Sequence, residues 1–80
     1  MPSVLSGEHD AAFNQLMDET TEALGLAKVS PDLDDLAACM AVALLKVSLA
    51  MHFVEQQHPG FGKDVEEKRQ RVMQAMQSWH

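Results

Sequence analysis

The fold of this chain is decided by residues 30–58, which read SPDLDDLAACMAVALLKVSLAMHFVEQQH. Ser30 is a good N-cap residue, Pro31 suits the first helical position, and the aspartates that follow complement the positive end of a helix dipole. At the other end, the sequence His58-Pro59-Gly60 stops the helix, because proline cannot continue it. The pattern predicts one helix over about 31–58, roughly 40 Å long.

Apolar residues surround this predicted helix on nearly every side. One stripe follows alternating spacings of three and four residues and comprises Leu33, Leu36, Met40, Ala43, Val47, Ala50 and Val54. A second stripe on a different face comprises Val42, Leu45, Leu49 and Phe53. A helix that is apolar nearly all round must be buried nearly all round. More partners are therefore needed than one covering helix.

Two shorter amphipathic helices are predicted on either side of the central one, after a loose start over residues 1–7. The first spans about 8–25, with Phe13, Leu16, Met17, Thr20 and Leu24 on one face and Gly25 as its C-terminal stop. The second spans about 64–79, begins with an Asp64-x-x-Glu67 capping box, and carries Val65, Val72, Met76 and Trp79 on one face. We expect both to pack antiparallel against the central helix.

The chain is short enough that its own core is thin. Eighty residues predict a single all-α domain over 1–80, a three-helix arrangement in which only about 60–65% of the unfolded surface is buried. The single cysteine, Cys39, is interpreted as a small buried hydrophobe and cannot form an internal disulfide. We therefore expect the antiparallel helical bundle to be completed by dimerisation.

The surplus apolar face of the central helix is the predicted interface. We expect it to pair with a second copy and to accept a helix of a client protein, with small residues allowing close backbone approach and methionines adapting to the client. The predicted interface residues are Val42, Leu45, Leu49, Phe53, Ala38, Ala41, Met40 and Met51.

Charge disfavours nucleic acid as a direct partner. The net charge is −6, whereas phosphate binding relies on clustered lysine and arginine. A helix-turn-helix would begin its recognition helix with Asp32, Asp34 and Asp35, which would repel phosphates. An acyl carrier is similarly disfavoured, because the stretch Asp34-Asp35-Leu36 lacks the serine that would carry the prosthetic group.

A membrane span over Leu36–Val54 is the alternative that the hydropathy of the segment raises. Lys46 falls at its centre, where inserting a lysine into a membrane costs about 2.5–3.5 kcal/mol, and His52 adds to this cost. No signal peptide is visible in the first residues. We expect a cytoplasmic protein with no membrane partner.

The cluster most like a metal site is His52, Glu55 and His58, spaced three residues apart. Glu55-x-x-His58 has the spacing of di-iron ligands, but such sites need a second pair and further carboxylates, which the chain lacks. No glycine-rich phosphate loop and no nucleophile–His–acid pattern is visible. We therefore expect no metal, no cofactor and no enzymatic activity.

The sequence favours a non-catalytic protein–protein interaction module: a small acidic adaptor, chaperone or inhibitor that acts as a homodimer. In general character the chain is similar to small acidic helical secretion chaperones and anti-activators that bind another protein's helix, although no motif is shared. The alternative is a small regulator of nucleic-acid machinery, acting by direct DNA binding or by masking a basic DNA-binding protein.

Overall fold

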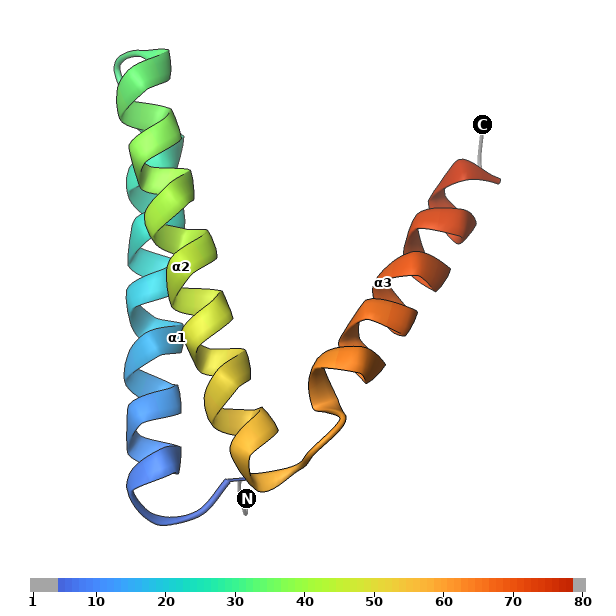
Figure 1. Cartoon of the computed structure of the whole chain (residues 1–80). Helices are drawn as coiled ribbons and strands as arrows, with labels where there is room; N and C mark the ends of the chain where they lie inside the picture. Colours follow the sequence, from blue (N-terminus) through green and yellow to red (C-terminus); the bar gives the residue numbers. More distant parts are fainter. Residues whose placement is uncertain (1–4, 79–80) are drawn as a thin grey trace.

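The computed structural model describes residues 5–78, which form three helices and, within that range, no strand. They are α1 (Gly7–Lys28), α2 (Leu33–Gln57) and α3 (Phe61–Gln77). The predicted all-α, three-helix fold is confirmed at this level. Helices α1 and α2 run antiparallel side by side, whereas α3 leaves the end of α2 and diverges from it, so that the chain forms a V (Figure 1). Trp79, predicted near the end of the third helix, lies outside the described residues.

The connection between α1 and α2 differs from the prediction at both ends. Helix α1 continues through Gly25 to Lys28, and the Ser30 hydroxyl donates to the Leu26 carbonyl instead of capping α2. The N-cap of α2 is Asp32, whose carboxylate accepts a 2.7 Å hydrogen bond from the Asp35 N–H. Aspartate caps as well as serine does, and Asp32 directly precedes the first helical residue. The predicted stop at Gly25 and the Ser30 cap are wrong.

Small side chains form the interface between α1 and α2. The buried residues are Ala23 and Thr20 of α1 and Ala43, Ala50 and Val54 of α2, with Ala50 only 2% exposed. Residues without bulky side chains let two helix axes approach closely, but they bury little apolar area. The core of the hairpin formed by α1 and α2 is therefore close-packed and thin.

Polar contacts connect the two hairpin helices near their middle and at their open end. Near the middle, Lys46 Nζ lies 2.7 Å from Glu19 Oε2. At the open end, the Ser6 N–H donates to the Gln57 side chain, whose Nε2 lies 2.7 Å from His9 Nδ1. Leu5 is buried beside this end, so the predicted loose start over residues 1–7 is wrong for its last residues: helix α1 already begins at Gly7.

The start of α3 is set by a glycine and a carboxylate from α2. Gly60 is the N-cap with φ +93°, a left-handed conformation that side chains rarely adopt. Glu55 accepts hydrogen bonds from the Gly60 and Gly62 N–H groups at 2.9 and 2.7 Å. Helix α3 thus begins before Asp64, and the predicted capping box over Asp64–Glu67 is wrong. The amides at this helix start are instead satisfied by Glu55, a carboxylate that lies earlier in the chain.

Candidate functional site

The chain exposes more surface than a compact protein of its size. A folded monomer of 8.8 kDa exposes on the order of 4,800 Å², whereas this chain exposes 6355 Å². Its radius of gyration is 15.1 Å, against about 12 Å for a compact 80-residue domain. The excess of roughly 1,600 Å² per chain lies in the range that obligate dimers bury.

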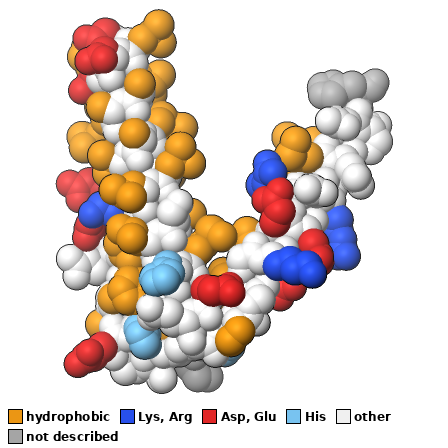
Figure 2. Space-filling view, in the orientation of Figure 1, with side chains coloured by type: hydrophobic (Ala, Val, Ile, Leu, Met, Phe, Trp, Pro, Cys, Tyr) orange, Lys and Arg blue, Asp and Glu red, His pale blue; other side chains and the backbone are white. Residues whose placement is uncertain are grey.

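Many large apolar side chains contribute to the exposed surface. Fourteen large apolar side chains are exposed among the described residues, seven of them on α2 alone. Figure 2 shows them along the length of α2 and on the part of α3 that faces it. Contiguous apolar patches larger than a few hundred Å² mark interaction sites in soluble proteins. The expectation that α3 would cover the seam of the central helix is wrong, because α3 meets α2 only near their connection (Figure 1).

One apolar region, here called the outer surface, lies on α2 away from α3. It consists of Ala38, Ala41, Val42, Leu45 and Leu49, all exposed. These residues belong to the predicted interface. Phe53, predicted with them, is half-buried, with its ring centroid 5.6 Å from that of His9 on α1.

The outer surface continues into an apolar notch between α1 and α2. The notch has a volume of about 150 Å³ and is lined by Ala23, Leu26, Ala38, Cys39 and Val42. An engineered apolar cavity of about this volume binds benzene, so the notch is large enough for an aliphatic or aromatic side chain. Cys39 is half-buried here, with Sγ 3.8 Å from the Ser30 hydroxyl.

A second apolar region, here called the V surface, lies between the two arms of the V. Residues eleven apart lie within about 20° of each other on an α-helix, so Leu33, Leu44 and Glu55 share one face of α2. Glu55 holds the start of α3, so that this face points into the V. The exposed apolar residues on this side are Met17, Leu24, Leu33, Met40, Leu44, Val47, Val72 and Met76.

Helical spacing places the contributions of α1 and α3 to the V surface. Leu24 lies about 160° around α1 from Leu26, which lines the notch, and so faces the opposite side of the hairpin. On α3, Val72 and Met76 follow the half-buried Val65 at seven and eleven residues and share its face. Met40 and Met51, predicted with the outer residues, lie four before and seven after Leu44 and therefore belong to this side.

Glu55 has the most defined electrostatic environment of the predicted polar cluster. Hydrogen bonds from the N–H groups of Gly62 and Gly60 lower the pKa of its carboxyl below the ordinary value. His52 contacts the Gln56 side chain at 3.1 Å, and His58 is the C-cap of α2, its N–H donating to Val54. Both carboxylate oxygens of Glu55 accept hydrogen bonds from backbone N–H groups, one from Gly60 and one from Gly62. Over residues 5–78, no group of three or more His, Cys, Asp or Glu side chains is placed to hold a metal ion.

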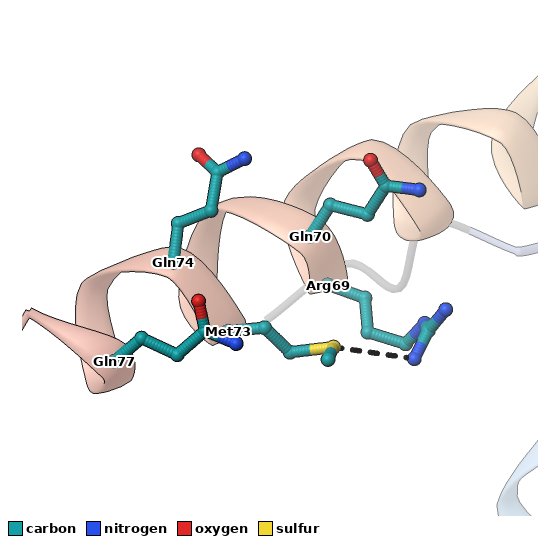
Figure 3. A pocket seen from close by; sticks show the side chains of 5 residues that line it. All are labelled: Arg69, Gln70, Met73, Gln74 and Gln77. Atoms are coloured by element: carbon teal, nitrogen blue, oxygen red, sulfur yellow. Dashed lines mark hydrogen bonds between the residues drawn. The ribbon is translucent and has the colours of Figure 1, made fainter.

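A shallow hollow of about 340 Å³ flanks the apolar stripe of α3 and is lined by Arg69, Gln70, Met73, Gln74 and Gln77 (Figure 3). Arg69 donates to Glu66 at 2.6 and 2.9 Å, and this pairing lowers the pKa of the Glu66 carboxyl. All five lining residues come from one exposed helix. In the part of the chain that the structure describes, no second element closes the hollow, so it holds no defined ligand geometry.

Within the described residues, α2 is the one helix long and apolar enough to cross a membrane, with a mean hydropathy of 1.9. Lys46, near the middle of α2, is paired with Glu19 of α1. Helix α1 packs along α2 and carries five carboxylates, which are costly to place in hydrocarbon.

Comparison with known protein families, curated proteins and solved structures found no match.

The V surface is the part of the site that sequence reasoning missed. The two stripes of α2 were visible in the sequence, but α3 was expected to cover one of them. The sequence carried no signal for the direction of α3, because that direction depends on Glu55 of α2 accepting hydrogen bonds from the Gly60 and Gly62 amides across the connection.

Proposed function

We propose that this protein is a non-catalytic protein–protein interaction module that acts in the cytoplasm as a homodimer and binds a helix of a partner protein. The observation that carries the proposal is the apolar excess: roughly 1,600 Å² more exposed surface than a compact chain, together with fourteen exposed large apolar side chains. Association is the general way in which a soluble chain hides such surface.

The outer surface suits a partner helix. It is a straight apolar strip on one helix, and amphipathic helices dock on such strips through residues at three- and four-residue spacings. The small side chains of Ala38 and Ala41 allow a second backbone to approach closely. The adjacent notch beside Val42 offers a pocket for one anchoring side chain, and interfaces take much of their affinity from a few anchors of this kind.

The surrounding charge favours a basic partner. The hairpin α1–α2, with its connection, carries nine of the twelve acidic residues and two of the six basic ones. Complementary charge raises the association rate and selects among partners. A client helix with an apolar stripe flanked by lysine or arginine fits this description best.

Two measurements test the proposal. Light scattering after size exclusion should give twice the 8.8 kDa chain mass at micromolar concentration. Wild-type and Leu49→Asp proteins should then serve as matched baits in the native host, because an aspartate on the outer surface adds a charge that a docking helix would have to desolvate. The proposal requires a protein that wild type captures and Leu49→Asp loses. A single-chain mass would refute the homodimer, and identical captured sets would refute the outer surface as the binding face.

A further inference from the structure

We propose that the second copy of the homodimer occupies the V surface, with α3 of each protomer inserted between α2 and α3 of the other. The proposal rests on the proposed homodimer and specifies how it forms. It leaves the outer surface of each protomer free for the partner protein.

The first support is the fit between the unpartnered faces. Met40, Leu44, Val47 and Met51 follow spacings of four, three and four along α2, the pattern of a helix–helix seam. Helix α3 is strongly amphipathic, yet its apolar residues Val72 and Met76 are exposed, with Met76 54% exposed. Each protomer thus offers one vacant seam and one vacant helix face, and a two-fold axis satisfies both with the same contact made twice.

Charge favours α3 over the hairpin as the occupant. Nine acidic and two basic residues give the hairpin with its connection a net charge of −7, whereas four basic and three acidic residues give α3 a net charge of +1. Pairing two hairpins through their outer surfaces would bring two strongly negative bodies together. Inserting α3 between the arms places the one helix with a net positive charge among residues 5–78 against the partner's acidic hairpin, which is the complementary arrangement.

The size of the protomer is consistent with interlocking. Its radius of gyration of 15.1 Å is close to the value of about 15 Å expected for a compact body of twice its length. Two open protomers that fill each other's gaps would therefore form a dimer hardly larger in radius than one protomer. The excess of roughly 1,600 Å² per chain, if buried, gives an interface of the size and apolar character typical of obligate homodimers.

Adjacent leucines on α2 provide a matched test. Leu44 on the V surface and Leu45 on the outer surface are 67% and 57% exposed within the protomer, so aspartate at either position leaves the hairpin core intact. We expect Leu44→Asp to raise the dimer dissociation constant by on the order of a hundredfold, because the two-fold axis places the substituted residue in the interface twice. Leu45→Asp should change it little. Sedimentation equilibrium of the full chain measures both, with circular dichroism as the check on folding.

Helix α3 provides a second, independent pair. Met76→Asp lies on the apolar face and should dissociate the dimer, whereas Gln74→Asp lies about 160° around the helix and should not. Small-angle scattering of the wild-type dimer should give a radius of gyration close to that of the protomer. A dimer joined through the outer surfaces would be clearly larger.

The outcomes separate the two proposals. Loss of the dimer in Leu44→Asp and Met76→Asp, with Leu45→Asp and Gln74→Asp still dimeric, supports the interlocked arrangement. A dimer lost only in Leu45→Asp overturns it and leaves the homodimer standing. A monomeric wild type with a radius of gyration near 12 Å, in which α3 has folded back on its own α2, overturns both the interlocked arrangement and the homodimer.

Discussion

The α1–α2 hairpin and α3 are held in place by different means. The hairpin has an interior of small buried side chains, an ion pair near its middle and a hydrogen bond between Gln57 and His9 at its open end. Helix α3 has no buried residue among those described and depends on Glu55, which binds its first amides, and on the left-handed Gly60. Packing therefore sets the position of one arm, whereas a few hydrogen bonds at a short connection set the direction of the other.

The largest expected effect follows from enlarging the hairpin interior. Ala50→Leu places a side chain where the wild-type residue is 2% exposed, so the helices must separate or strain, at a cost of about 1–3 kcal/mol of unfolding free energy. Ala41→Leu, on the exposed side of the same helix, is the matched control and should leave stability nearly unchanged. Urea unfolding compares the two. Equal stabilities would mean that α1 and α2 are not closely packed at Ala50.

Two glycines offer the next test, with effects of opposite sign. Gly60→Ala forces a side chain into φ +93° and should destabilise the start of α3 by about 1–2 kcal/mol. Gly25→Ala lies inside α1 with open space around the new Cβ and should stabilise the protein by about 0.4–1 kcal/mol. Thermal unfolding by circular dichroism measures both. A stabilising Gly60→Ala would contradict the left-handed connection.

As pH falls, the start of α3 should lose its hydrogen bonds to Glu55 before the α1–α2 hairpin unfolds. The pKa of Glu55 is lower in the folded chain than in the unfolded one, so its contribution is fully present above the unfolded value of about 4.3 and is lost as pH falls through the folded value. Hydrogen exchange at the amides of Gly60 and Gly62 should accelerate over that range. In Glu55→Gln these amides should already be fast at neutral pH and respond less to acid. Glu22→Gln, an exposed carboxylate on α1, should behave as wild type.

The smallest effect is expected at the ion pair between Lys46 and Glu19. The hydrogen bond to Lys46 lowers the pKa of the Glu19 carboxyl, but both side chains are partly exposed, and such pairs contribute little after screening. Lys46→Met should change the thermal midpoint of unfolding slightly and should make that midpoint less dependent on salt concentration. A large loss of stability would show that the pair is a main determinant of the hairpin register.

The sequence determined the helical elements well because each depends on local chemistry. The apolar run of α2 and the stop at His58-Pro59-Gly60 predicted the central helix to within two residues at each end. The N-cap was misplaced because Ser30 and Asp32 are equivalent caps, and only the tertiary position of Ser30 beside Leu26 separates them. Gly25 was read as a stop because glycine disfavours helices, a weak preference that packing against α2 overrides.

The candidate surface was predicted in part. The sequence has more apolar helix faces than covering helices, so some apolar residues of α2 must be exposed. Val42, Leu45 and Leu49 are among them. The direction of α3 could not be read from the sequence, because it depends on Glu55 reaching two backbone amides across the connection. Periodicity identifies which residues of a helix share a face, but not which other helix that face meets.

The alanine-rich interior of the hairpin has a thermodynamic consequence. The heat capacity change of unfolding and the denaturant m-value both scale with the apolar surface that unfolding exposes, and the buried side chains of this hairpin are small, three of them alanine. An isolated protomer should therefore unfold over a broad range of temperature, with a shallow dependence on urea. Association would bury the large side chains that the protomer leaves exposed, so the transition should sharpen and its midpoint rise as protein concentration increases.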